Sequence, residues 1–442
     1  MPKIISISLS PNVFPIDLVA ARHMLGRLHE WREGEHLASL ADAFSRYHGV
    51  SKDRVFSFNS GRSALLGALA SLGIGEGDEV LLQSFTCNAV PNPVLWAGAM
   101  PIYVDVNEHT FTMDVADLER KITRRAKAII IQHTFGLATD MDEILSVAKR
   151  HKLFVIEDCA HALGATYPAS AAPSLRSYPC SAKHVACGTR GKKAGTMGDM
   201  AFFSFGRDKV ISSVYGGMLL INNANLLGEV KERYEALQYP DNQWIRQQLR
   251  HPLSMDVFLR WYNFPFSNYG AGKFCLQAAQ VTHYLSKAVH WKEKQGLRPS
   301  YFPSRLPNAL AYLALTQFKR LDEFNAHRRA LAQLYYDELC SLKTKNLKLK
   351  TLQDGHIYLR YPVRHPRAHE IIRAARNRGI LLGDWYTNAI APDDTQLKAM
   401  HYQEGSCPVA EGLARETFNL PTNPSMSERD AHRVVEFLRT AL

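Results

Sequence analysis

The stretch Leu153-Phe154-Val155-Ile156-Glu157-Asp158-Cys159-Ala160-His161 joins a short apolar run to a group of ionisable side chains. Aromatic and β-branched residues in a run this short indicate a buried strand. The strand would end at Glu157-Asp158, with His161 three residues beyond Asp158. A carboxylate at the end of a buried strand needs a partner, because an unpaired buried charge is costly. The stretch therefore predicts either a structural ion pair or a functional site.

A second apolar run, Met200-Ala201-Phe202-Phe203, is followed through Ser204 by Lys209. Lysine is rarely buried without a partner, and burial turns it into a nucleophilic amine able to form a Schiff base. Such a lysine, with a carboxylate that can pair with a pyridinium, is the core requirement of pyridoxal phosphate chemistry. Taken alone, Lys209 could equally be a surface lysine in a turn.

Strand-like and helical patterns alternate from about Val55 to Asn222, which predicts an α/β fold with a mostly parallel sheet flanked by helices. In such sheets ligands bind at the carboxyl ends of the strands, where Asp158 and His161 lie. The predicted strands are Glu79–Leu82, Pro101–Val106, Lys127–His133, Lys152–Glu157, Ala201–Phe205 and Met218–Asn222, and the predicted helices are Arg62–Leu72, Asn88–Ala97, Val115–Lys121 and Met141–His151.

The pattern divides the chain into an N-terminal segment (1–40), a large domain (41–300) and a C-terminal part (301–442). Residues 168–193, rich in Ala, Ser and Pro and then basic, are expected to be a loop or insertion. Cys180, His184 and Cys187 within it lack the spacing of a metal site, so no metal is predicted.

The C-terminal part should contain one long helix and a smaller α+β domain. Its predicted elements are the helix Leu306–Leu342, the strand His356–Val363, the helix Ala368–Asn377, the strand-like Ile380-Leu381-Leu382 and two terminal helices, the last beginning at a capping box formed by Ser427 and Asp430.

Composition places the 442-residue chain among globular proteins, with 46% hydrophobic residues and a net charge of +11. The charge favours phosphate-bearing partners, and no nucleic-acid-binding signature accompanies it. No apolar run approaches the roughly 18 to 20 residues of a membrane helix. Seven cysteines without a dense spacing pattern favour a reducing cytoplasm over a disulfide framework.

Asn59-Ser60-Gly61-Arg62-Ser63 precedes an apolar helix. Free N–H groups at a helix N-terminus attract anions, and the Arg62 guanidinium suits phosphate. Alone this is more often a plain N-cap. A phosphate loop, an acidic strand end and a lysine, in that order on one framework, make a cofactor site the better explanation.

With further motifs, these residues resemble the DegT/DnrJ/EryC1/StrS family of pyridoxal-phosphate aminotransferases, which has the aspartate-aminotransferase (fold type I) architecture. The matching motifs are Ser60-Gly61-x-x-Ala64-Leu65, Gly75-x-Gly77-Asp78-Glu79-Val80, Gly98-Ala99-x-Pro101-x-Tyr103-Val104-Asp105, Val155 to His161, Gly198-Asp199 with Phe203-Ser204-Phe205 and Lys209, and Cys407-Pro408-Val409-Ala410-Glu411.

The resemblance implies that Lys209 holds pyridoxal 5'-phosphate as an internal aldimine and then acts as the general base. Asp158 would pair with the pyridine nitrogen, and His161 would contact the cofactor near its 3-oxygen. The phosphate would be held by Gly61, Arg62, Ser63 and Ser204.

The family also implies a homodimer and a ping-pong amino transfer, with glutamate as donor, to a nucleotide-linked keto-sugar, as in polysaccharide biosynthesis. Sugar dehydratases of this fold replace the lysine by histidine, so Lys209 argues against that reaction. A pyridoxal-phosphate-binding regulator that retains the same residues stays open.

The chain departs from the family pattern at Cys87 and Arg62, in the segment Pro303-Ser304-Arg305, where only Arg305 matches, and in the length of the 168–193 insertion. The aromatic residue that commonly follows Ser-x-Thr and stacks on the cofactor is here Cys87, after Ser84-Phe85-Thr86. Either its sulfur contacts the ring or another group covers that face. Arg62 stands where the family usually has threonine.

Overall fold

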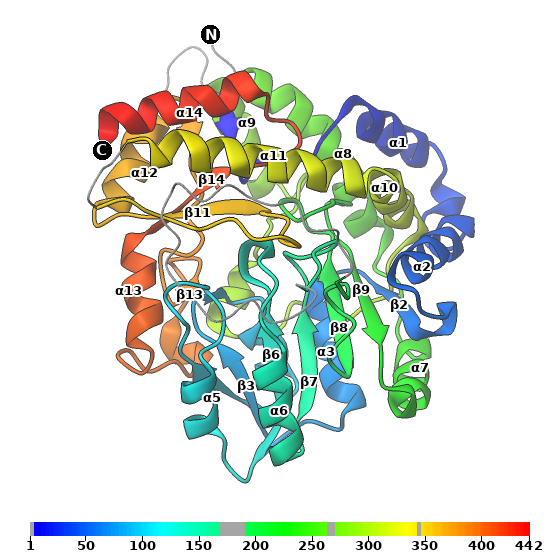
Figure 1. Ribbon diagram of the computed structural model, residues 1–442. Helices are drawn as coiled ribbons and strands as arrows, with labels where there is room; N and C mark the ends of the chain where they lie inside the picture. Colours follow the sequence, from blue (N-terminus) through cyan, green and yellow to red (C-terminus); the bar gives the residue numbers. More distant parts are fainter. Residues whose placement is uncertain (1–3, 168–190, 263–269, 343–345) are drawn as a thin grey trace.

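The computed structural model describes residues 4–167, 191–262, 270–342 and 346–442. At its centre lies a seven-stranded sheet (Figure 1). In sheet order its strands are β2 (Val55–Phe58), β9 (Gly217–Ile221), β8 (Met200–Ser204), β7 (Phe154–Asp158), β6 (Ala126–Gln132), β3 (Glu79–Gln83) and β5 (Met100–Val104).

Strand β9 runs antiparallel to both of its neighbours, and the other neighbouring pairs are parallel. The mostly parallel α/β sheet predicted from the sequence is therefore confirmed. Six of its strands coincide with predicted ones. The seventh, β2, was not among them, since its four residues Val55-Phe56-Ser57-Phe58 are too short to show a period.

Helices cover both faces of the sheet, with α5 and α6 in front of it and α3 behind it in Figure 1. Asp114 caps the N-terminus of α5, because its side chain accepts a hydrogen bond from the Asp117 N–H. The helices up to residue 300 are α1 (Pro15–Leu25), α2 (Glu35–His48), α3 (Gly61–Ser71), α4 (Pro91–Trp96), α5 (Val115–Lys121), α6 (Asp142–His151), α7 (Leu227–Glu235), α8 (Asn242–Arg260) and α9 (Ala271–Val281).

The expected long helix over 306–342 is wrong, because the structure has two helices there, α10 (Asn308–Phe318) and α11 (Leu321–Cys340). Arg320 interrupts them with φ −109° and ψ 11°. The acidic Asp322 and Glu323 stand in the first turn of α11, where the helix dipole favours negative charge. The spacing of apolar residues alone does not reveal the two-residue break between Phe318 and Leu321.

After α11, the C-terminal part carries a three-stranded antiparallel sheet in the order β10-β11-β14 and three further helices among the described residues, with the predicted capping box of Ser427 and Asp430 at the start of the last. These elements are β10 (Lys348–Leu349), β11 (Arg360–Arg364), β14 (Thr417–Pro421), α12 (Ala368–Asn377), α13 (Pro408–Glu416) and α14 (Glu428–Ala441).

Two short parallel pairs tie distant parts of the chain together. Strand β1 (Ile5–Ser6) pairs with β12 (Ile380–Leu381), and β4 (Thr86–Cys87) pairs with β13 (Ile390–Ala391). The division at residues 40 and 300 stays a prediction. The expected insertion lies mostly outside the described residues, at 168–190.

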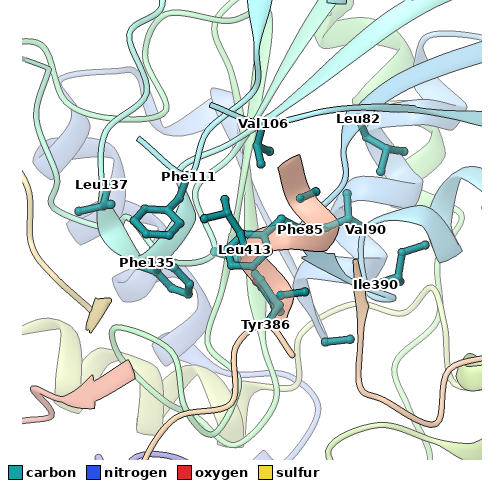
Figure 2. Packing of buried hydrophobic residues seen from close by; sticks show 14 of the residues in the cluster. Leu82, Phe85, Val90, Val106, Phe111, Phe135, Leu137, Tyr386, Ile390 and Leu413 are labelled. Carbon is teal, nitrogen blue, oxygen red and sulfur yellow. The ribbon is translucent and has the colours of Figure 1, made fainter. Parts of the chain in front are cut away.

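An aromatic cluster packs the strand ends against the C-terminal part (Figure 2). Phe85 follows β3 and Phe135 follows β6, and both rings contact Tyr386. The centroid of Tyr386 lies 5.3 Å from Phe85, edge to face, and 6.0 Å from Phe135, stacked. This contact places residues 385–391 at the carboxyl edge of the sheet. Within the described ranges, no helix combines the length and apolarity needed to cross a membrane.

Candidate active site

Lys209 lies in the turn after β8, and its partly buried side chain meets His161 across the sheet edge. The Nζ atom is 2.9 Å from the His161 Nε2 atom. Asp158 is the last residue of β7, the strand that pairs with β8. The sheet thus brings the two polar groups noticed in the sequence to one place, because the carboxyl ends of adjacent parallel strands share an edge.

The hydrogen bonds of His161 define which ring nitrogen carries its proton. The Phe135 N–H donates to Nδ1 over 3.3 Å, so the proton of the neutral ring lies on Nε2. Burial, and then the charges of Lys209 and Arg360, hold the pKa of His161 well below its usual range. The ring is therefore neutral, and its Nε2 faces the Lys209 amine.

Asp158 is buried with few partners. Its Oδ1 accepts the Ala160 N–H over 3.0 Å. Burial raises the pKa of Asp158 to about 6, although this hydrogen bond and the charge of Lys209 oppose the rise. A buried carboxylate in this condition lacks a cation, which is what a protonated pyridine nitrogen would provide.

The neighbouring Glu157 is instead saturated with donors. It accepts hydrogen bonds from the Tyr167 hydroxyl, the His133 ring, and the N–H groups of Gly195, Met197 and Gly198. Burial opposes its charge, but these hydrogen bonds and His133 hold the pKa of Glu157 below its usual value. Glu157 anchors residues 195–198 before β8. It is also part of a possible metal-binding triad with His133 and Cys159, but its oxygens are already occupied.

The N-terminus of α3 lies against the end of β8. A Cβ atom on Gly61 would stand 3.0 Å from the Ser204 Cβ and 3.4 Å from its Oγ. A Cβ on Gly217 would stand 2.6 Å from the Gly61 nitrogen. Glycine at 217 lets β9 approach the first turn of α3, so the backbone N–H groups of that turn and Ser204 lie together, as an anion site requires.

Arg62 and Ser63 are engaged elsewhere. The Arg62 guanidinium pairs with the fully buried Glu293, and its Cζ lies 4.8 Å from the Phe302 ring centroid. Burial opposes the charge, yet Glu293 raises the pKa of Arg62. The Ser63 hydroxyl donates to Asn59 Oδ1 over 2.6 Å, and its N–H donates to Ser60 Oγ. That these two side chains hold a phosphate stays a prediction.

Cys87 lies at the site, on β4. Burial raises the pKa of its thiol, the charge of Lys209 lowers it and that of Asp158 raises it, so the thiol is close enough to feel both groups. Its thiol form presents no charge there. Whether its sulfur contacts a cofactor stays a prediction.

A sequence profile described as the DegT/DnrJ/EryC1/StrS aminotransferase family matches residues 20–251 and 274–439. The chain belongs to this family. Among similar proteins is a GDP-perosamine synthase from Caulobacter vibrioides, 30% identical over 414 residues that cover 92% of this chain and 91% of the relative. Another is a dTDP-3-amino-3,4,6-trideoxy-alpha-D-glucose transaminase from Micromonospora megalomicea subsp. nigra, 29% identical over 92% of this chain and 90% of that one.

The fold agrees with the family. The crystal structure of the sugar aminotransferase CalS13 from Micromonospora echinospora superposes with a TM-score of 0.69 at 20% identity, covering 100% of both chains. The chain is thus a fold type I aminotransferase, and this family depends on pyridoxal phosphate. Its site fits that cofactor, because a partly buried lysine, an under-partnered aspartate and open helix N–H groups converge.

Four residues of this aminotransferase site were missed in the sequence. The Asn12 amide donates to the Lys209 carbonyl over 2.5 Å. Arg360 pairs with Asp208 over 3.2 Å, and its guanidinium lies on the ring of Trp385. Asp208 directly precedes Lys209 and could have been noticed. The other three come from distant segments and carry no local signal.

Proposed function

We propose that the chain transfers the amino group of glutamate to a keto-sugar carried by a nucleotide, in a ping-pong reaction. The observation that carries this proposal is the 2.9 Å contact between Lys209 Nζ and His161 Nε2 beside Asp158. The names of the relatives above support a nucleotide-linked sugar. The net charge of +11 suits a diphosphate.

Bound pyridoxal phosphate supplies an electron sink that lets a proton leave the α-carbon of the donor. Asp158 would stand against the pyridine nitrogen and keep it protonated. His161 would donate its Nε2 proton to the 3-oxygen. Lys209, freed by the donor, would take the proton from the α-carbon and return it two atoms away, as a 1,3-proton shift requires. Gly61, Arg62, Ser63 and Ser204 would hold the phosphate.

Half-reactions test the proposal. Glutamate added to the loaded protein should remove the visible absorbance band and release one equivalent of 2-oxoglutarate. A panel of nucleotide-linked keto-sugars should then restore the band for one member. Lys209→Ala should form no such band. If glutamate leaves the band unchanged, the donor is wrong. If no keto-sugar restores it, the acceptor class is wrong.

We also propose that the chain works as a homodimer in the cytoplasm, as the family resemblance implies. Light scattering tests the first part and cell fractionation the second. A fully active monomer would contradict the dimer.

A further inference from the structure

The indole of Trp385 lies against both reactive groups of the site. Its ring centroid is 4.6 Å from Lys209 Nζ, close enough for a favourable amine–π contact. It also stacks on the His161 ring, with centroids 4.8 Å apart and planes 15° apart. Trp385 is itself only partly buried. One aromatic side chain thus borders the amine and the imidazole whose mutual contact defines the site.

The indole is held by a partly buried ion pair between Arg360 and Asp208. The Arg360 Cζ lies 3.2 Å from the Trp385 ring centroid, and the Arg360 side chain is 1% exposed. Its Nη2 pairs with Asp208, while its Nη1 is buried without a hydrogen-bond partner. Since a buried guanidinium with few hydrogen bonds gains much from an aromatic face, Arg360 fixes the position of Trp385.

The segment that carries Trp385 is bonded to the segment that carries Cys87. Strands β13 and β4 pair in parallel with Ala391 opposite Cys87. The Asn88 N–H donates to the Ala391 carbonyl over 2.8 Å. Strand β4, which has Cys87 where the family commonly has an aromatic residue, therefore lies next to the segment whose Trp385 contacts Lys209.

We propose that Trp385 is the aromatic positioning residue of this site. It keeps the His161 ring and the Lys209 amine, the two groups that would touch the cofactor, in place. This inference rests on cofactor use by the family. It does not depend on the identity of the amino donor or of the sugar, so it can be tested with pyridoxal phosphate alone.

Cofactor affinity is the first measurement. Trp385→Leu should bind pyridoxal phosphate about tenfold more weakly than the unaltered protein, the size expected for the loss of one stacked aromatic pair. Trp385→Phe should stay within about threefold, since it keeps a ring.

Fluorescence is the second measurement and does not depend on how well the leucine variant folds. The chain has 6 tryptophans, and the indole nearest the bound cofactor should be quenched most strongly. Trp385→Phe should therefore remove a large share of the quenching that pyridoxal phosphate causes. Trp261→Phe is the matched control, because Trp261 is 51% exposed at the end of α8, and it should leave affinity unchanged.

Two results would overturn the proposal. One is unchanged cofactor affinity in Trp385→Leu together with unchanged quenching in Trp385→Phe. The other is a variant whose cofactor binding is normal and whose KM for the sugar alone rises, which would make Trp385 part of the acceptor site. If glutamate is not the donor, or a nucleotide-linked keto-sugar is not the acceptor, the changes in cofactor affinity and in fluorescence quenching should still occur as predicted.

Discussion

At the residue scale, two adjacent carboxylates at the end of β7 stand in opposite environments. Glu157 accepts hydrogen bonds from five donors, whereas Asp158 accepts one, from a backbone N–H. Their pKa values move in opposite directions for this reason. The charged Glu157 stabilises the fold. The charged Asp158 lowers the stability of the fold, and a bound cation would offset that loss.

Asp158→Asn should stabilise the cofactor-free protein. Because the folded-state pKa of about 6 lies above the ordinary 3.8, the charge costs up to about 3 kcal/mol above pH 6 and nothing once both states are protonated, below pH 3.8. The variant should gain stability in urea unfolding well above pH 6, lose that gain near pH 4, and bind pyridoxal phosphate more weakly. A variant less stable than the parent at high pH would contradict this account.

Glu157→Gln should have the opposite effect. Its amide would turn an N–H toward donors and leave buried N–H groups unpaired, at a cost of about 3 kcal/mol or more. Since its folded-state pKa is lowered, the carboxylate stabilises the protein above its ordinary value of 4.5 and less as the pH falls. Unfolding by urea near neutral pH measures the loss. An unchanged midpoint would show that the five donors find other partners.

At the element scale, the contact of β9 with the first turn of α3 decides whether the phosphate end of the site can form. In Gly217→Ala the new methyl would meet the Gly61 nitrogen and the Ser60 carbonyl carbon at 2.6 Å, both backbone atoms. We expect a loss of roughly 1–3 kcal/mol in the free energy of unfolding and weaker cofactor binding.

The matched control is Gly228→Ala in α7, where no atom lies within 4 Å of the new methyl. It should be neutral or stabilise the helix by up to about 1 kcal/mol. If both variants behave alike in thermal unfolding and cofactor titration, the close approach at Gly217 does not matter.

At the scale of the whole molecule, three distant segments hold the turn that carries Lys209. Asn12 binds the Lys209 carbonyl, the fully buried Arg328 binds the Val210 carbonyl over 2.7 Å, and Arg360 binds Asp208. The lysine therefore becomes fixed only when the N-terminal segment, α11 and β11 have all docked.

Asn12→Ala should loosen this turn from a distance. A buried carbonyl left without its donor costs about 1–3 kcal/mol. We expect faster amide hydrogen exchange around Lys209 and weaker pyridoxal phosphate binding, with the half-reaction still complete at saturating cofactor. Ser8→Ala, at an exposed position of the same segment, should change neither. Equal exchange rates in both variants would show that the segment does not brace the site.

The sequence by itself determined six of the seven strands of the central sheet, the strand end that carries Asp158, the strand that precedes Lys209, and the family. Those features depend on short-range periodicity and on residues near one another in the chain. Only the tertiary structure decided that α10 and α11 are separate, that Arg62 turns to Glu293, and that Trp385, Arg360 and Asn12 surround Lys209. These contacts join segments more than 150 residues apart, so they follow from how the sheet, the first helices and the C-terminal part pack, which no local pattern encodes.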